Sequence, residues 1–382
     1  MRIAVIGAGP AGLYFAYCLK RACPDAAISI FEQNHSGATF GFGIVFSDRA
    51  LDFLAADDPD TYTLLSRHLE RWNELAVVHR GEKVAVDGIG FAAIGRLAFL
   101  KLLQERAATL GLEPNYGRRI DTVAELGAFD LIVGADGVKS TLRDGRSTAF
   151  GTEVIDLSNR FAWYGTPKPF GCLTQTFVNT EHGAFNAHHY RYGPDVSTFI
   201  VETSEATWQR SGLSAMGEAA SQRFCEAVFA EALDGAPLIS NRSVWRRFPQ
   251  VRNRAFAAGN VVLIGDALHT AHFSIGSGTR MALEDAVALA NAIASHPGDL
   301  AAAVTGFEVA RRPLLDKLLA AADASGRWYE QFERHMSLAP FDFTMSYLCR
   351  SGRVEPARIA ATSPRFMAEW ARHRTTSRDS TS

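Results

Sequence analysis

The chain has 382 residues with 47% hydrophobic and 21% charged side chains, which is typical of a globular protein and excludes extensive disorder. Its 39 basic and 41 acidic side chains give a formal net charge of −2, so nothing indicates a nucleic-acid or membrane-surface partner. No CxxC pair, leader pattern or long apolar run is present, and we expect a cytoplasmic protein that binds no metal.

The N-terminus predicts a strand, a glycine turn, a helix and a second strand. The run 2–6 leads into the turn GAGPAG at 7–12, an amphipathic stretch follows at 13–21, and the run 27–31 ends at Glu32. In a dinucleotide-binding βαβ unit such glycines permit a tight turn and close approach of a pyrophosphate, and the later acid binds ribose hydroxyls. A purely structural glycine turn is the alternative. The expected cofactor contacts are Gly7, Gly9, Ala11, Gly12, Glu32 and Gln33.

The glycine-rich segment 35–46 indicates backbone passing close to a flat ligand, with a plain surface loop as the alternative. Residues 48–75 predict helices and residues 77–86 predict strands. The segment 88–93 imitates a second nucleotide turn, GxGxxA, but the strand before it is short and Phe91 is bulky. We therefore expect no nucleotide there.

Arg96 opens an amphipathic helix at 97–110. A basic side chain at a helix start opposes the helix dipole, so Arg96 should have an anionic partner, and a cofactor phosphate is one candidate. A surface arginine is the alternative.

The middle of the chain predicts a buried parallel strand at 129–133 that enters a turn with Asp136 and Gly137. An acid flanked by glycines at a strand end lies where open α/β sheets bind ligands. Residues 160–202 are rich in aromatic and β-branched residues and predict an antiparallel sheet. A helix is expected at 214–233, followed by a basic stretch at 242–254.

A further buried strand is predicted at 260–264, directly before Asp266. A second glycine turn, GSGT at 276–279, precedes a helix at 280–293. On a flavin, the free N–H groups of this helix would stabilise negative charge on the reduced ring. A last helical region is expected at 300–332, and a disordered tail from Thr375.

The motifs GAGPAG, GADGVKSTLR and GDALHTAHFSIGSGTRMALEDA stand in this order and together resemble the single-component FAD-dependent aromatic hydroxylases, the group of p-hydroxybenzoate hydroxylase. The resemblance implies an α/β fold with a Rossmann-like FAD-binding domain and an inserted antiparallel-sheet substrate domain. We expect the FAD-binding domain at residues 1–158 and 250–335, the substrate domain at 159–249, and a C-terminal segment with a disordered tail at 336–382.

The resemblance also implies roles for single residues. The first motif and Glu32 would hold the ADP half of FAD, Arg96 would touch the cofactor, and Asp136 with Gly137 would serve both FAD and NAD(P)H. Asp266 would bind the ribityl chain, and the turn beneath the isoalloxazine would comprise Gly276, Ser277, Gly278 and Thr279. Two positions depart from the pattern: Phe273 replaces a usual proline and Arg280 an asparagine.

The segments HFSIGSG, WYGTPKPF and SNRSVWRRFPQVRNR are similar to a narrower branch that includes salicyloyl-CoA 5-hydroxylases, anthraniloyl-CoA monooxygenase and the violacein-pathway hydroxylase. The branch implies that NAD(P)H reduces FAD and that one oxygen of O2 enters an aromatic ring through a flavin C4a-hydroperoxide. The expected reaction is salicyloyl-CoA to gentisyl-CoA, catalysed by a monomer or homodimer.

The residues that touch the substrate are open to several interpretations. A base near neutral pH would activate a salicyl hydroxyl, and His272, His188 and Tyr190 are candidates, while Tyr164 is expected to bond the substrate. For each of these residues, the alternative interpretation is a purely structural role. Arg246 and Arg247, in the densest basic cluster, would meet the CoA phosphates unless this stretch is a solvated face.

Two other functions stay open on the sequence alone. One is a hydroxylase of a free aromatic or indole compound, which would be indifferent to the CoA group. The other is a non-hydroxylating flavoprotein, a reductase, oxidase or FAD-bound partner protein, which the departure at Phe273 keeps open.

Overall fold

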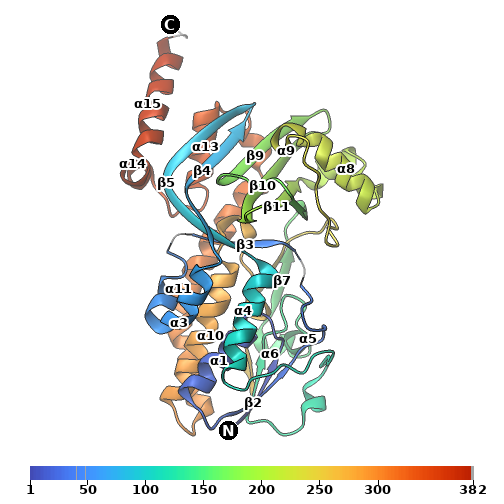
Figure 1. Ribbon diagram of the computed structural model, residues 1–382, viewed down its shortest axis with the longest axis vertical. Helices are drawn as coiled ribbons and strands as arrows, with labels where there is room; N and C mark the ends of the chain where they lie inside the picture. Colours follow the sequence, from blue (N-terminus) through green and yellow to red (C-terminus); the bar gives the residue numbers. More distant parts are fainter. Residues whose placement is uncertain (40, 48, 380–382) are drawn as a thin grey trace.

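The computed structural model of the protein describes residues 1–39, 41–47 and 49–379. The molecule is elongated, with one sheet in its lower part and a larger sheet in its upper part (Figure 1). The N-terminus lies at the lower end, and the C-terminal helix projects beyond the upper end.

The lower sheet has five strands in the order β13-β14-β6-β1-β2. The pairs β1–β2, β1–β6 and β6–β14 are parallel, and only β13 runs antiparallel to its neighbour. Nearly continuous apolar runs form its centre because helices cover both faces of such a sheet. Its strands are β1 (Arg2–Ile6), β2 (Ala27–Phe31), β6 (Leu131–Gly134), β13 (Ala257–Ala258) and β14 (Val261–Leu263).

Four long helices pack with the lower sheet: α1 (Pro10–Ala22), α4 (Arg96–Ala108), α10 (Gly278–Ser295) and α11 (Leu300–Tyr329). Helix α1 packs against α4 and α10, and α10 against α11. Their buried side chains join the strands in one core that includes Phe15, Phe99 and Leu283. The remaining helical turns of this part are α2 (Asp52–Asp57), α3 (Pro59–Ser66), η1 (Val123–Leu126), α5 (Thr141–Asp144), α6 (Ser147–Phe150), η3 (Gly265–Ala267) and η4 (Phe273–Ile275).

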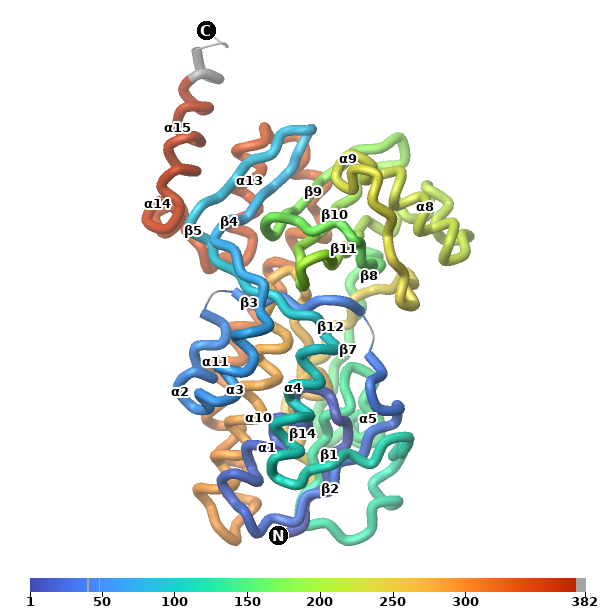
Figure 2. Tube along the Cα trace, in the orientation of Figure 1, coloured from blue at the N-terminus to red at the C-terminus, as the bar shows by residue number. Residues whose placement is uncertain are grey.

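The upper sheet has seven strands in the order β3-β5-β4-β9-β10-β11-β8. Its neighbours are antiparallel except β4 and β9, which run parallel. Its strands are β3 (Gly43–Ser47), β4 (Glu70–His79), β5 (Glu82–Gly95), β8 (Arg160–Thr166), β9 (Leu173–Thr180), β10 (Gly183–Gly193) and β11 (Val196–Thr203). A small ribbon of β7 (Glu153–Asp156) and β12 (Pro249–Arg252) lies between the two sheets in Figure 2.

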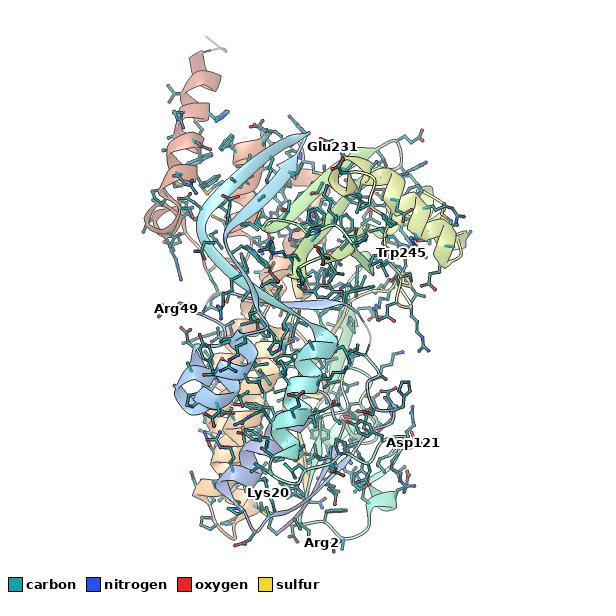
Figure 3. The ribbon with its side chains drawn as sticks, viewed as in Figure 1. Arg2, Lys20, Arg49, Asp121, Glu231 and Trp245 are labelled. Atoms are coloured by element: carbon teal, nitrogen blue, oxygen red, sulfur yellow. The ribbon has the colours of Figure 1, made fainter. Side chains whose placement is uncertain are left out.

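The two faces of the upper sheet pack against different elements. The outer face, with Tyr164, Phe185 and Phe199, packs against α8 and α9. The inner face, with Tyr190 and Phe177, packs against the end of α11 and against α13 (Pro340–Cys349). Trp245, labelled in Figure 3, joins the outer core, and its indole N–H donates to Ser221 at 2.6 Å. The helices above the outer face are α7 (Glu205–Arg210), η2 (Leu213–Ala215), α8 (Glu218–Val228) and α9 (Ala230–Leu233).

The upper sheet is wider than the sequence predicts. Strands β3, β4 and β5 come from residues 43–95, which the expected domain boundaries assign to the FAD-binding part. The boundaries at residues 158 and 250 stay a prediction, but the sheet extends beyond them. The helical expectation for 48–75 is wrong from Glu70, where β4 begins, and residue 48 lies outside the described residues. Leu75 and Val77 alternate toward the inner core, and this period of two favours a strand.

Two glycines of the segment 35–46 pack against side chains of the upper sheet, and the expected approach of this segment to a flat ligand stays a prediction. A Cβ on Gly41 would lie 3.3 Å from the Trp163 ring, and one on Gly43 would lie 2.6 Å from Tyr192. These glycines therefore make room for side chains of the protein itself. As expected, Gly88 and its successors form no nucleotide turn, because they belong to β5.

The C-terminal segment covers the upper sheet with α12 (Phe332–His335), α13 (Pro340–Cys349), α14 (Pro356–Thr362) and α15 (Pro364–Asp379). Helix α15 is anchored on β5, where the Phe366 N–H donates to Asp87 Oδ1 at 3.0 Å. The disorder expected from Thr375 is wrong as far as Asp379, and residues 380–382 lie outside the described residues. Across the described chain, no helix is both long and apolar enough to cross a membrane.

Candidate active site

The three glycine-containing motifs follow three adjacent strands, β1, β6 and β14, at their carboxyl ends. Direct packing joins them: a Cβ on Gly7 would lie 2.3 Å from the Ala135 carbonyl oxygen, and one on Gly265 would lie 3.0 Å from Ala11 Cβ. The Arg143 guanidinium links the second and third motifs through the Ala267 carbonyl, 3.4 Å away. Motifs more than a hundred residues apart thus form one surface at the edge where open parallel sheets bind ligands.

The turn before α1 has the properties of a pyrophosphate cradle. Gly7 has a φ of +103°, and Gly12 leaves no room for a Cβ, which would lie 2.0 Å from the Gly7 carbonyl oxygen. Gly9 differs, because a Cβ there would meet no described atom within 4 Å, so its backbone faces open space. No side chain caps α1, and no acid occupies its first turn. Its N–H groups and positive dipole end therefore face an anion site.

Glu32 lies at the end of β2, beside this turn. Its carboxylate accepts hydrogen bonds from the Ala8 N–H at 2.9 Å and from the Asn34 N–H at 2.8 Å. The Asn34 side-chain amide also donates to it at 2.7 Å, and because a carboxylate has about four acceptor positions, one position remains for a ribose hydroxyl. Gln33 points elsewhere and accepts from Arg119 at 3.3 Å, which gives no support to its expected cofactor contact.

The second glycine turn lies at the start of α10. Gly276 has a φ of +60°, a Cβ on Gly278 would meet no described atom within 4 Å, and Thr279 lies in the first turn. Ser277 is the N-terminal cap residue, but its hydroxyl turns back to the Ile275 carbonyl at 3.2 Å. This helix, like α1, starts without a side-chain cap or an acid and can stabilise negative charge.

Asp266 is exposed although the residues on either side of it, from Val261 to Thr270, are buried. The protein groups around the carboxyl group still displace much of the water near it, which raises its pKa, and the charge of Arg96 opposes this rise. Arg96 opens α4 as expected, and its guanidinium makes no hydrogen bond to any described residue. These features fit a cofactor that accepts bonds from Arg96 and offers hydroxyl groups to Asp266.

Asp136 mainly stabilises its own turn. Its Oδ2 accepts from the Thr141 N–H at 2.8 Å, whereas its buried Oδ1 has no partner among the described residues. Gly137 has a φ of +79°, and a Cβ there would meet no described atom within 4 Å. The assignment of these two residues to FAD and NAD(P)H stays a proposal.

A buried ionic network holds the third motif in place. Asp285 on α10 is fully buried and accepts from the Gly265 N–H at 3.0 Å, His269 Nε2 at 2.7 Å and Arg311 Nε at 2.7 Å. Burial raises the pKa of Asp285, but His269 and Arg311 outweigh it and hold the pKa below its usual value. Because the network fixes Gly265, it positions the adjacent Asp266.

The loop before Gly276 is bound to the C-terminal segment. His272 Nδ1 lies 2.8 Å from Ser274 Oγ, which lies 2.7 Å from Ser325 Oγ. Arg350 donates to Ser325 Oγ at 3.1 Å and to the Ser274 carbonyl at 2.8 Å. Aromatic rings surround His272, with Phe248 at 5.1 Å and Phe273 at 4.3 Å between ring centroids.

His188 lies on the inner face of the upper sheet, close enough to His272 for the two rings to interact electrostatically. Burial and the charge of Arg350 lower the pKa of both imidazoles to about 3. Both are therefore neutral near pH 7, and neither fits the expected base with a pKa near neutrality.

The two tyrosine candidates have other roles. Tyr164 is buried on the outer face, 3.3 Å from Ser221 Oγ, so the sheet separates it from His188 and His272. We exclude it from the site because alternate residues of a strand face opposite sides. The Tyr190 hydroxyl donates to the Gly43 carbonyl at 2.9 Å and thus links β10 to β3.

Arg246 and Arg247 do not form a joint phosphate patch. The Arg247 guanidinium pairs with Glu205 at 3.2 Å. The Arg246 guanidinium lies over the Phe161 ring, 5.3 Å from its centroid, and partial burial together with the charge of Arg96 lowers its pKa. Among the described residues no carboxylate pairs with Arg246. Arg246, unlike Arg247, is therefore close enough to Arg96 for their charges to interact.

Sequence reasoning missed the positioning residues. Asp285 is part of the third motif, and its buried position on one helix face was the available signal. Arg350 carried no signal, because only the tertiary fold brings it to the His272 loop.

Replacing Asp266 with Ala should yield a folded protein that purifies without flavin colour, because the exposed carboxylate makes no hydrogen bond to any described residue. Asp266→Asn keeps the shape and hydrogen-bonding capacity and should retain part of the cofactor. The ratio of flavin to protein absorbance measures this, and a fully yellow Ala variant would remove Asp266 from the site.

Comparisons with known proteins agree with this geometry. The family described as "FAD binding domain" matches residues 117–303. A salicyloyl-CoA 5-hydroxylase of a Streptomyces species is 40% identical, over 98% of this chain and 74% of that protein. A 3-hydroxy-4-methyl-anthranilyl-[aryl-carrier protein] 5-monooxygenase of Streptosporangium sibiricum is 38% identical, over 86% of this chain and 89% of that protein. Protodeoxyviolaceinate monooxygenase of Chromobacterium violaceum is 34% identical, over 93% of this chain and 96% of that protein.

The fold has solved counterparts. The tetrameric form of 2-methyl-3-hydroxypyridine-5-carboxylic acid oxygenase superposes with a TM-score of 0.69, covering 94% of this chain and 95% of that one at 18% identity. The architecture is therefore an FAD-binding part of Rossmann type with a sheet-based substrate part, as expected from the sequence.

Proposed function

Because this chain belongs to the family of FAD-dependent aromatic monooxygenases, we propose that it hydroxylates an aromatic acyl thioester, with salicyloyl-CoA to gentisyl-CoA as the reaction. The observation that carries this proposal is the 40% identity to a salicyloyl-CoA 5-hydroxylase across 98% of the chain. A second relative also acts, by its name, on an aryl group attached to a carrier. This supports a tethered substrate rather than a free acid.

The residues of the chain fit FAD, which supplies the activated oxygen once NAD(P)H has reduced it. The N–H groups at the start of α1 would bind the pyrophosphate, and Glu32 and Asp266 would bind hydroxyl groups of the two cofactor halves. The start of α10 would stabilise negative charge on the reduced ring. The pyrophosphate, hydroxyl and ring-charge assignments remain our proposals.

Aromatic side chains next to this site form a wall against which we expect the substrate ring to bind. Phe161, Phe248 and Phe273 surround the His272 loop, and the Phe161 and Phe273 centroids are 5.0 Å apart. Such a wall binds an aromatic ring and excludes water, which protects reactive oxygen from wasteful decay. In a salicyl group the 2-hydroxyl lies para to C5, so electron donation from it activates the carbon to be hydroxylated.

The test is NADH consumption by the yellow protein in aerobic buffer with salicyloyl-CoA, anthraniloyl-CoA, free salicylate or tryptophan. We expect stimulation by the thioesters and a product that gains one oxygen. Stimulation by free salicylate alone would overturn the thioester proposal. Stimulation by tryptophan would favour the alternative, hydroxylation of a free indole or aromatic compound, which the likeness to protodeoxyviolaceinate monooxygenase supports.

The different surroundings of the two arginines predict different effects on thioester binding. Arg246→Ala should raise the KM for salicyloyl-CoA about tenfold or more, because a charge-assisted bond to a phosphate contributes roughly 1.5–3 kcal/mol. Arg247→Ala is the control, because Glu205 already holds its guanidinium. Steady-state kinetics at constant flavin content measure both, and equal effects would contradict the assignment of Arg246.

A further inference from the structure

Three adjacent strands place buried polar side chains on the inner face of the upper sheet. His188 on β10 is directly opposite Gln175 on β9, and Asn186 on β10 is directly opposite Glu202 on β11. Paired residues and residues two apart share a face, so all four point the same way. The relative exposures of Gln175 and His188 are 0% and 4%.

Several polar atoms of these side chains have no hydrogen-bond partner among the described residues. Both ring nitrogens of His188 and Nε2 of Gln175 belong to this set, and Asn186 Oδ1 and Glu202 Oε2 extend it. A buried polar atom without a partner costs about 1–3 kcal/mol, so it is rare unless a ligand or water completes the site. Their concentration on one face indicates a polar ligand.

The orientation of Gln175 is fixed by its neighbours. Its Oε1 accepts from the Tyr329 hydroxyl at 3.0 Å and from Asn186 Nδ2 at 3.2 Å. The hydrogen-bond network thereby assigns Nε2 as the group left to donate.

His188 offers one donor and one acceptor. Burial and the charge of Arg350 lower its pKa to about 3, so the ring is neutral near pH 7. A neutral imidazole donates from one nitrogen and accepts at the other. Together, Gln175 and His188 present two donor groups, an NH2 and a ring N–H, and one acceptor on adjacent strands.

The pair lies beside the expected reaction site. His188 interacts electrostatically with His272, which comes four residues before Gly276 in the turn that leads to α10. The Tyr329 ring, bonded to Gln175, lies 5.6 Å from the His272 ring. A substrate ring held against the aromatic wall would bring its substituents to Gln175 and His188.

We propose that Gln175 and His188 recognise the ortho pair of the substrate, its thioester carbonyl and the adjacent hydroxyl or amino group. The N–H groups of Gln175 and His188 donate to the carbonyl oxygen, and the second His188 nitrogen accepts from the ortho O–H or N–H. The inference rests on the proposed function and deepens it. It makes the protein selective for 2-hydroxy- and 2-aminobenzoyl thioesters over benzoyl thioesters.

The strength of this selectivity follows from the burial of the two side chains. A site built to hydrogen-bond a hydroxyl group rejects the analogue that lacks it by up to about 10⁴-fold, because its own polar groups then stay unpaired. We expect at least about 100-fold tighter binding of salicyloyl-CoA than of benzoyl-CoA by the FAD-loaded protein.

The experiment measures equilibrium binding of both thioesters to the FAD-loaded protein through the change in flavin absorbance, without NADH. His188→Leu should reduce the preference for salicyloyl-CoA to less than about tenfold, chiefly by weakening salicyloyl-CoA binding. Gln175→Leu is a second variant with the same expectation. His189→Leu is the matched control, because His189 points to the outer face and its Nε2 bonds Thr176 at 2.9 Å.

The outcomes separate the two levels of the proposal. If the wild type prefers salicyloyl-CoA and both Leu variants keep that preference, the ortho-pair inference fails while the proposed function stands. If the wild type binds neither thioester, the proposed function fails, and the inference fails with it. A preference lost in both variants and kept in His189→Leu supports the inference.

Discussion

Asp285→Asn is expected to lower the free energy of unfolding by about 3 kcal/mol and to yield protein with little flavin. The substitution removes the negative charge that pairs with His269 and Arg311, and Arg311 is only 4% exposed. Arg311 keeps its ion pair with Glu284, but it loses one of two carboxylates, and a buried cation that is only partly compensated is destabilising. The Gly265 N–H also loses its carboxylate acceptor, so the turn that presents Asp266 loosens. Urea unfolding and the flavin-to-protein absorbance ratio measure the two effects.

Glu284→Gln is the matched control on the same helix. Glu284 also contacts Arg311, at 2.9 Å, but it makes no hydrogen bond to the Gly265 turn in the described chain. We expect a smaller loss of stability and near-normal flavin content. Equal flavin loss in both variants would show that general destabilisation, rather than the position of Asp266, controls cofactor binding.

Gly12→Ala should prevent the formation of a stable, flavin-binding protein. The added Cβ would lie 2.0 Å from the Gly7 carbonyl oxygen and 3.1 Å from Val5, in the centre of the packed sheet and helix. The Gly7 carbonyl oxygen belongs to the backbone of the turn and cannot move away without breaking the β1–α1 unit. Circular dichroism and thermal unfolding of the purified protein test this, and a variant as stable as the wild type would contradict it.

Gly9→Ala separates a packing role from a cofactor role in the same turn. Gly9 has extended backbone angles that alanine adopts readily, and a Cβ there would meet no described atom within 4 Å. The variant should therefore fold with near wild-type stability yet bind FAD at least about tenfold more weakly, because the methyl group occupies the approach of the pyrophosphate. Unchanged FAD affinity would remove Gly9 from the cofactor site.

The sequence predicts the lower part of the molecule well because its signals are local. Gly7, Gly12 and Glu32 lie within one βαβ unit, where turn, helix packing and acid position follow from neighbours in the chain. The buried runs that form β6 and β14 are equally evident, since helices cover both faces of the sheet. The fold class follows from this pattern.

The upper sheet and the substrate residues depend on contacts that are remote in sequence. Strand β4 pairs in parallel with β9 across about a hundred residues, and no periodicity in either strand indicates that partner. Tyr164 and His188 both lie in strands whose side chains point alternately to the two faces of the sheet. Only the packing of α8 on one face shows which of the two residues faces the site.

Charge states could not be predicted either. The sequence gives no sign that His188 and His272 differ from other histidines. Burial beside Arg350 lowers the pKa of both to about 3, which makes them too weakly basic for the expected role. Arg246 and Arg247 are adjacent in sequence, yet Glu205 holds one while the other faces Arg96. Three-dimensional surroundings decide each of these properties.

The most direct test of the proposed reaction is isotope transfer from oxygen gas. The purified yellow protein is incubated with NADH and salicyloyl-CoA under ¹⁸O2, and the aromatic product is examined by mass spectrometry. We predict a dihydroxybenzoyl thioester with one ¹⁸O atom in the ring hydroxyl that is added. NADH consumption that yields only hydrogen peroxide, or a product whose new oxygen comes from water, would contradict the assignment as a thioester hydroxylase.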